Sequence, residues 1–189
     1  DDILGTLAKR NYGQDIEVVI VTADRDALQL VSDHISVASP FKGFSNITFY
    51  DRAAIHGKWG ISPEQFVDFK ALSGDASDNV PGVPGIGEKT ALSLLKQYDN
   101  LENIYAHLDD MAESLRRKLS DNKDLAFFSR WLCTIRLDVP ISFDLKNSEI
   151  SSLDRPEVLQ FFEKLGFRSL MTRVKLSINT VEEKQGTLF

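Results

Sequence analysis

The chain has 189 residues, of which 42% are hydrophobic and 26% are charged, as in ordinary globular proteins. No apolar run approaches the roughly 20 residues that span a bilayer, and the first residues lack the basic start and apolar core of a signal peptide. The single cysteine excludes an internal disulfide framework. We therefore expect a cytoplasmic protein with no membrane partner.

The formal net charge of −6 is low for a nucleic-acid-binding domain, because phosphate contacts favour an excess of Lys and Arg. Net charge averages over sites, however. A protein that concentrates carboxylates to hold divalent cations is acidic overall and still meets phosphates through metal and backbone N–H groups. The net charge alone therefore neither supports nor excludes binding to nucleic acid.

The first part of the chain alternates predicted helices and strands. A helix is expected at Asp1–Arg10, followed by Ile16–Thr22, a β-branched run typical of a strand buried on both faces of a parallel sheet. A short helix at Ala27–Val31 and two short strands at His34–Ala38 and Ile47–Tyr50 complete this part. The alternation predicts an α/β fold.

From residue 62 onward the predicted elements are helical. Ser62-Pro63-Glu64-Gln65 is a capping box with proline at the first helical position, and it opens a helix whose buried stripe holds Phe66, Phe69 and Leu72. Further helices are expected at Glu88–Tyr98, Leu101–Leu108, Ala112–Leu119, Asp121–Arg136 and Glu157–Leu165, the last stopped by Gly166.

The helix predicted at Asp121–Arg136 carries an apolar stripe of Leu125, Phe128, Leu132 and Ile135. Cys133 lies in this pattern, and we expect a buried structural thiol rather than a nucleophile.

The sequence therefore predicts four regions. They are an α/β part at 1–61, a helical DNA-binding region at 62–140, a returning helical segment at 141–176 that packs on the core, and a flexible tail or linker at 177–189.

Asp24 and Asp26 come directly after the buried strand. The carboxyl ends of such strands are where open α/β sheets bind ligands, and carboxylate oxygens are preferred ligands of Mg²⁺ and Mn²⁺. Two other interpretations stay open. Asp24 caps the next helix with Asp26 as a first-turn charge, or Asp24 is the nucleophile of a phosphatase, although Leu28 stands where that class carries Thr or Val.

Two further aspartate pairs accompany this one. Asp75 and Asp78 lie three residues apart, which places both carboxylates on one side of a helical turn, and such a pair is unfavourable unless a cation lies between them. Asp1 and Asp2 open the first helix, where the helix dipole also favours negative charge. The alternative for Asp75 and Asp78 is a polar loop that satisfies its own backbone.

Six aspartates in three clusters predict two metal ions rather than one. Two divalent cations about 4 Å apart bind the attacking and leaving oxygens of a phosphoryl displacement, and one of them lowers the pKa of the attacking water. His34, His56 and His107 are scattered, so we do not expect zinc.

The segment Gly82-Val83-Pro84-Gly85-Ile86-Gly87 lies between two predicted helices. Its glycines allow close approach to a ligand, and backbone N–H groups at the following helix start bind phosphate without reading bases. Val83 and Ile86 anchor the hairpin, while Lys89 adds charge beside Thr90. A tight turn without ligand is the alternative, and the neighbouring Asp75 and Asp78 favour the phosphate site.

The run Gly74–Ala91 resembles the signature of the 5′-nuclease (flap endonuclease) superfamily, and it is most similar to the 5′→3′ exonuclease domain of bacterial DNA polymerase I. Thr22–Val31, the Asp1-Asp2 helix, Cys133–Pro140 and Gly166–Leu170 match the family in the same order. The resemblance covers about residues 1–175.

The resemblance implies a partial PIN-like α/β nuclease core followed by a helix–three-turn–helix (helix-hairpin-helix) domain. It implies two Mg²⁺ or Mn²⁺ ions, with Asp1, Asp2, Asp24 and Asp26 towards one site and Asp75 and Asp78 towards the other, and a K⁺ ion at the glycine hairpin. It also implies duplex DNA with a 5′ flap, nick or RNA primer as substrate, a polymerase domain in the parent chain, and a bacterial, nucleoid-associated location.

Family members carry a first half that this sequence lacks, with further metal ligands and the helical arch. We therefore expect little activity from this chain alone, and either a complementing N-terminal fragment or exchange between copies. The rival hypothesis is a non-catalytic module that binds duplex DNA without sequence preference.

Overall fold

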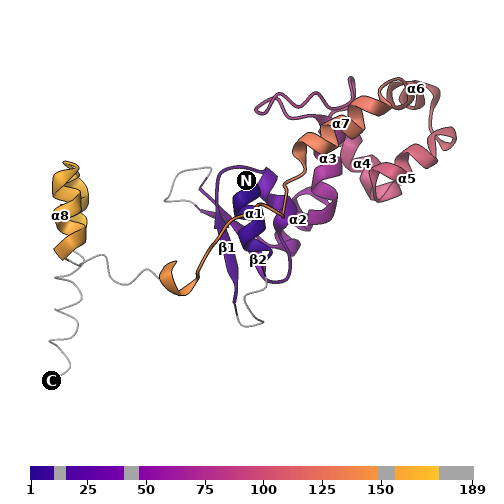
Figure 1. Cartoon of the computed structure of the whole chain (residues 1–189). Helices are drawn as coiled ribbons and strands as arrows, with labels where there is room; N and C mark the ends of the chain where they lie inside the picture. The colour runs from indigo at the N-terminus through magenta and orange to yellow at the C-terminus, as the bar shows by residue number, and fades with distance from the viewer. Residues whose placement is uncertain (11–15, 41–46, 149–155, 175–189) are drawn as a thin grey trace. The chain divides into compact units, whose positions relative to one another are not determined.

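The computed structural model describes residues 1–10, 16–40, 47–148 and 156–174 (Figure 1). The chain forms two compact units, Asp1–Ile141 and Ser142–Phe189, and each is described by itself. In the described ranges no helix is long and apolar enough to cross a membrane.

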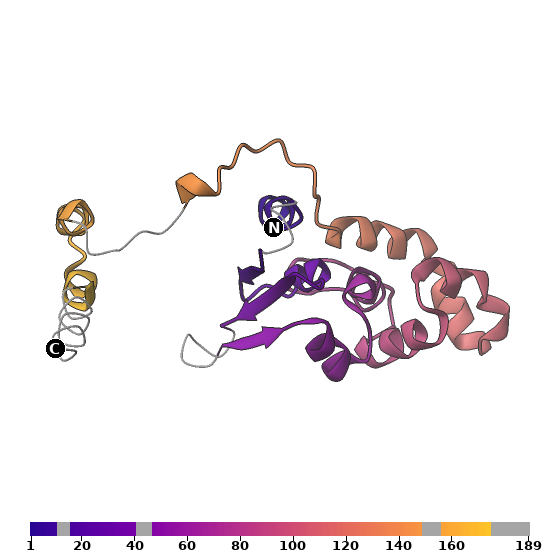
Figure 2. The same cartoon turned by 90° about the horizontal axis from the view of Figure 1, so that it is seen from below.

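The first unit contains a three-stranded sheet in the order β1-β2-β3. Strands β1 (Val18–Val21) and β2 (Ile35–Ser39) pair in parallel, with Val19 opposite Ser36, and β3 (Thr48–Tyr50) pairs antiparallel to β2 (Figure 2). The expectation of a first strand buried on both faces is wrong, because Val19 and Val21 are exposed. Among the described residues β1 is an edge strand, so part of its surface has no neighbour.

Short helices surround this sheet. They are α1 (Asp2–Ala8), the 3₁₀ turn η1 (Asp26–Leu30), α2 (Arg52–Trp59) and η2 (Pro63–Gln65). Helix α2 is absent from the sequence prediction, although its boundaries carry ordinary signals. Asp51 accepts a hydrogen bond from the Ala54 N–H at 2.7 Å, and Gly60 ends the helix in the left-handed region.

The rest of the first unit is helical, as expected. Its elements are α3 (Phe66–Ser73), α4 (Glu88–Tyr98), α5 (Leu101–Ala106), η3 (Leu108–Asp110), α6 (Glu113–Asp121) and α7 (Lys123–Cys133). The capping box at Ser62 and Gln65 is present, and α4 begins and ends where the sequence predicts. The predicted α/β core followed by a mainly helical region is confirmed.

Helix α3 lies at the centre of this unit. Phe66 is fully buried, and its ring meets Trp59 and Phe69 edge-on with centroids 5.3 and 5.5 Å apart. On another side of α3, the buried Asp68 carboxylate accepts the Leu101 N–H at 2.9 Å and faces Arg130 at 3.6 Å. This carboxylate therefore ties α3 to the start of α5 and to α7.

Helix α7 turns a different face inward from the one expected. Phe128 is 51% exposed and Trp131 is 69% exposed, and Leu132 is exposed as well. The buried residues are the smaller Ala126, Ser129 and Cys133, which let α7 lie close against α3. Ile135 is buried as predicted, and so is Cys133, whose thiol has a pKa raised by burial.

The second unit contains η4 (Lys146–Ser148) and α8 (Pro156–Lys164). Helix α8 lies where the sequence predicts it, and Gly166 follows with a positive φ of 72°. Packing of residues 141–176 on the core stays a prediction. The expected tail at 177–189 lies outside the described residues.

Candidate active site

Asp24 and Asp26 stand at the carboxyl end of β1, as the sequence predicts. The Asp24 N–H donates to Thr22 Oγ1 at 3.1 Å, and Asp24 Oδ1 accepts the Asp26 N–H at 2.9 Å. The capping interpretation is thus partly realised, because the Asp24 carboxylate supports the first turn of η1. Asp24 also offers one carboxylate oxygen to a group of three carboxylates.

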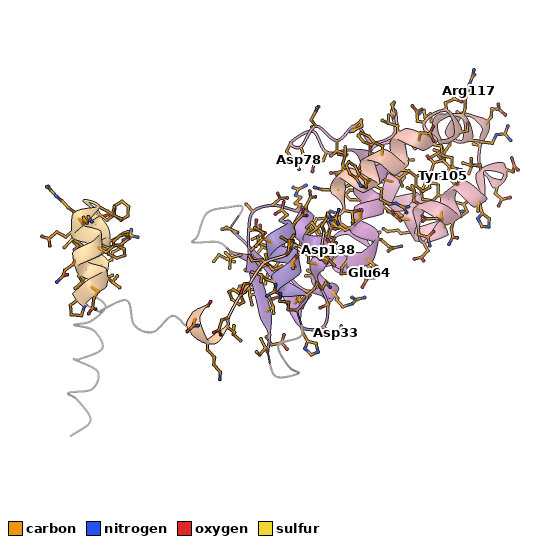
Figure 3. All side chains as sticks on the ribbon, viewed as in Figure 1. Asp33, Glu64, Asp78, Tyr105, Arg117 and Asp138 are labelled. Atoms are coloured by element: carbon orange, nitrogen blue, oxygen red, sulfur yellow. The ribbon has the colours of Figure 1, made fainter. Side chains whose placement is uncertain are left out.

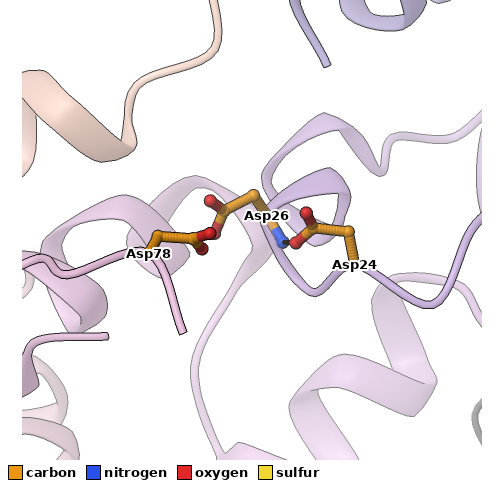
Figure 4. Close-up of side chains that lie close together, drawn as sticks. All are labelled: Asp24, Asp26 and Asp78. Atoms are coloured by element: carbon orange, nitrogen blue, oxygen red, sulfur yellow. Dashed lines mark hydrogen bonds between the residues drawn. The ribbon is translucent and has the colours of Figure 1, made fainter. Parts of the chain in front are cut away.

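Asp78 comes to the same place from a distant part of the chain. One carboxylate oxygen each from Asp24, Asp26 and Asp78 lies within 4.8 Å of the others (Figure 4). Asp78 stands on a turn beyond α3 (Figure 3). The turn is closed by two backbone hydrogen bonds between Asp75 and Val80, of 2.8 and 2.9 Å.

The expected helical turn at Asp75–Asp78 is therefore wrong. Asn79 adopts a positive φ of 56°, which reverses the chain and lets Val80 pair back onto Asp75. The two carboxylates consequently point to different partners. The sequence pattern specifies the spacing of the pair, whereas the local backbone conformation decides where each side chain points.

The Asp75 carboxylate bonds to Ser77 and Lys70 and is not one of the three grouped carboxylates. Its Oδ1 accepts hydrogen bonds from the Ser77 N–H and hydroxyl, and its Oδ2 lies 2.6 Å from Lys70 Nζ. Burial opposes ionisation of Asp75, but the hydrogen bonds from Lys70 and Ser77 outweigh it and lower the pKa of this carboxyl to about 2. Asp75 is therefore ionised at neutral pH.

Lys70 lies against this group of carboxylates, and the sequence prediction missed it. Its side chain is only 6% exposed, and Nζ also contacts Asp26 Oδ1. A lysine four residues after Phe66 falls on the same, inward side of the helix, and this spacing is the signal in the sequence. Such a lysine requires a carboxylate partner, because an unpaired buried ammonium is costly.

Asp1 and Asp2 lie apart from this group. Asp2 Oδ1 accepts the Arg136 N–H at 2.9 Å, and Asp1 precedes α1 without a side-chain capping bond. Within the residues that the structure describes, neither joins Asp24, Asp26 and Asp78 as a ligand group. Their role in metal binding stays a prediction.

The glycine hairpin is anchored as expected. Val83 and Ile86 are buried, and the Val83 N–H donates to Leu72 O at 2.9 Å. The Gly82 N–H donates to Ser129 Oγ at 3.1 Å, which fixes the hairpin to α7. The Ile86 N–H donates to Val83 O at 3.0 Å. The backbone N–H groups of Gly82, Val83 and Ile86 therefore donate hydrogen bonds within the protein and do not face a ligand.

The outward side of the hairpin consists of other residues. Gly85, Gly87 and Lys89 are exposed, and Thr90 is half-buried in the first turn of α4. Within the described ranges the Gly85 and Gly87 N–H groups have no acceptor. Lys118 Nζ donates to Gly85 O at 3.1 Å, so α6 brings a second cation to this surface.

The three carboxylates fit a hard divalent cation. They offer oxygen ligands alone, with no His or Cys in the group, and three like charges this close repel unless a cation lies among them. The residues thus fit Mg²⁺ or Mn²⁺ better than zinc.

The fold, with three carboxylates gathered beyond the end of a strand and an anchored glycine hairpin after α3, is shared with solved 5′-nucleases. The 5′-exonuclease of T5, in a structure described as having zinc ions bound, superposes with a TM-score of 0.55 at 26% identity over 62% of this chain and 42% of its own. A T5 flap endonuclease complex with DNA and metal ions shares the fold, with a TM-score of 0.61 at 24% identity over 70% of this chain and 48% of its own.

Residues 1–60 match the N-terminal resolvase-like domain of the 5′-3′ exonucleases, and residues 61–156 match the C-terminal SAM fold of the same family. The chain belongs to the 5′-3′ exonuclease family.

Curated relatives include DNA polymerase I of several bacteria. DNA polymerase I of Bacillus caldotenax is 42% identical over 185 residues, which are 97% of this chain and 21% of that protein. DNA polymerase I of Bacillus subtilis is 40% identical over 186 residues, or 98% of this chain and 21% of that protein. The chain spans about a fifth of the length of these relatives.

Proposed function

We propose that the chain is the metal-binding and duplex-binding part of a 5′→3′ exonuclease and flap endonuclease that hydrolyses phosphodiesters at 5′ flaps, nicks and RNA primers. The observation that carries the proposal is the meeting of Asp24 and Asp26 with Asp78 from a distant turn. This turn and the glycine hairpin belong to one continuous segment, residues 75–87, which supports a proposed metal ligand and proposed phosphate-binding groups acting on one substrate.

Asp24, Asp26 and Asp78 would hold one divalent ion, Mg²⁺ or Mn²⁺, through one oxygen each. Asp75, which faces Asp26 across Lys70, would join this site when the ion is bound, and Asp1 and Asp2 would supply ligands towards a second ion. Two such ions supply an activated water and offset negative charge on the leaving oxygen. The protein itself keeps Asp75 ionised, because hydrogen bonds from Lys70 and Ser77 lower the pKa of this carboxyl to about 2, and it fixes Asp24 through its bond to the Asp26 N–H.

The hairpin would grip the duplex strand beside the cut. The outward Gly85 and Gly87 N–H groups, with Lys89 and Thr90, suit phosphate oxygens and read no bases. A K⁺ ion bound by hairpin carbonyls belongs to the same proposal. It would compete with Lys118, whose ammonium now bonds to the Gly85 carbonyl.

The parent protein would be a bacterial DNA polymerase I, with a polymerase domain in the same chain, as the relatives' names suggest. A nucleoid-associated location is part of the same proposal. The open edge of β1 gives a complementing segment, or a second copy, a place to pair by backbone hydrogen bonds.

The test is single-turnover cleavage of a labelled 5′-flap duplex by excess protein in Mn²⁺. We expect slow cleavage that disappears in EDTA and in Asp26→Asn and Asp78→Asn, while both variants still bind the duplex. The matched control is Asp33→Asn, because Asp33 is a highly exposed carboxylate outside the group of three. Duplex binding without any cleavage, together with unchanged Mn²⁺ affinity in both variants, would favour the non-catalytic DNA-binding module instead.

A further inference from the structure

Lys70 is a buried lysine placed between two of the proposed metal ligands. Its side chain leaves α3 and ends against Asp26 on one side and Asp75 on the other, with Nζ 2.6 Å from Asp75 Oδ2. Among the described residues it is the lysine that is buried, at 5% exposure of the whole residue. A group this costly to bury is kept only where its partners are strong.

The ammonium has a clear electrostatic task in the metal-free protein. Asp26 shares the group of three with Asp24 and Asp78, and Asp75 is ionised nearby, so four carboxylates converge here. Without a cation their mutual repulsion would destabilise the turn at Asp75–Val80. One lysine charge offsets part of this repulsion, and it does so from the position that joins Asp26 to Asp75.

A divalent ion that binds Asp26 and Asp75 together needs the space that Nζ occupies. The structure offers the lysine a second position. A cavity of about 160 Å³ lies beside Lys70, and Ser73, Gly74 and Glu88 are among its lining residues. Glu88 is an exposed carboxylate at the start of α4, directly after the glycine hairpin. Arg25, Asp75 and aromatic rings also line this cavity, so a lysine side chain that rotates into it leaves Asp26 and comes to lie among the carboxylates of Asp75 and Glu88, with Arg25 nearby.

We infer that Lys70 is a tethered counter-ion that competes with a divalent cation for Asp26 and Asp75, and that metal binding moves its ammonium into the cavity lined by Glu88. Lys70 is thus a positioning residue, which holds the carboxylates in place until the ion replaces it. This inference rests on the proposed metal site. It also links the site to the hairpin, since Glu88 begins the helix that presents Lys89.

The test measures Mn²⁺ binding to the whole chain by titration calorimetry. Lys70→Met keeps the length and removes the charge, and the matched control Lys96→Met removes an exposed charge from α4. We expect Lys70→Met to bind Mn²⁺ about tenfold more tightly than wild type, because the competing charge is gone, and to unfold at lower urea concentration in EDTA. Lys96→Met should change neither quantity.

Unchanged or weaker Mn²⁺ binding by Lys70→Met would overturn the inference. That result is expected if Lys70 helps to orient the carboxylates for the ion instead of competing with it. If neither wild type nor Lys70→Met binds Mn²⁺, both the proposed metal site and this inference are wrong. If wild type binds Mn²⁺ and Lys70→Met does not bind it more tightly, only this inference is wrong. A second measurement needs no variant. Acetylation of wild-type Lys70 by an N-hydroxysuccinimide ester, followed by mass spectrometry, should accelerate when Mn²⁺ is added, and an unchanged rate would contradict displacement.

Discussion

Replacing Gly82 with alanine is expected to destabilise the first unit by about 3 kcal/mol. Gly82 has a φ of 61°, and a left-handed backbone costs an alanine about 1 to 2 kcal/mol. A Cβ at this position would lie 2.3 Å from Gly74 N, 2.6 Å from Gly74 Cα and 2.8 Å from the Ser73 carbonyl carbon. These are backbone atoms, so relief requires the hairpin to move away from α3, at a further cost of about 1 to 3 kcal/mol.

The same substitution at Gly57 is the matched control. Gly57 lies in the middle of α2, and a Cβ there meets no atom within 4 Å. Alanine is a better helix former than glycine, so Gly57→Ala should stabilise the protein by about 0.5 to 1 kcal/mol. Two identical chemical changes are therefore predicted to act in opposite directions.

The assay is urea unfolding followed by circular dichroism, with free energies of unfolding from linear extrapolation. A loss of less than about 1 kcal/mol in Gly82→Ala would refute the reasoning. It would mean that the hairpin backbone does not approach Gly74 as closely as the geometry states.

Three further predictions follow from named contacts. Lys89→Met should weaken duplex binding and reduce the slope of log affinity against log salt by about 0.9, measured by fluorescence anisotropy, whereas Lys96→Met should leave the slope unchanged. Asp68→Ala should lower the free energy of unfolding by about 3 kcal/mol, because it removes the partner of the Leu101 N–H and of Arg130. Glu102 also pairs with Arg130 but is exposed, so Glu102→Ala should lower the free energy of unfolding by only about 0.5 kcal/mol. The pKa of Asp75 is depressed in the folded state, so its stabilising contribution is present above pH 3.8 and disappears as the pH falls towards 2. The difference in urea midpoint between wild type and Asp75→Asn should shrink over that range, and a constant difference would contradict the assignment.

Local signals in the sequence account for the parts of the structure that were predicted correctly. The capping box at Ser62 fixes the start of the helical region, and α4 follows from its own pattern of three inward residues, Ala91, Leu94 and Leu95. The location of Asp24 and Asp26 was predicted correctly because it depends only on where strand β1 ends. The anchoring of Val83 and Ile86 follows from apolar side chains between glycines.

The features that were missed depend on contacts between distant segments. Helix α2 buries Ile55 but shows little apolar periodicity, so its capping residues carry most of the signal. The inward face of α7 is chosen by close approach to α3, and this favours Ser129 over the larger Phe128. The diversion of Asp75 to Lys70 likewise requires knowledge of where α3 lies. Periodicity in one segment cannot specify such choices.

Anomalous diffraction from crystals of the chain soaked with MnCl₂ would show whether Asp24, Asp26 and Asp78 bind one divalent ion together. We expect an anomalous peak within coordination distance of all three carboxylates. A peak elsewhere on the chain, or none at this position at a Mn²⁺ concentration that saturates binding in solution, would contradict it.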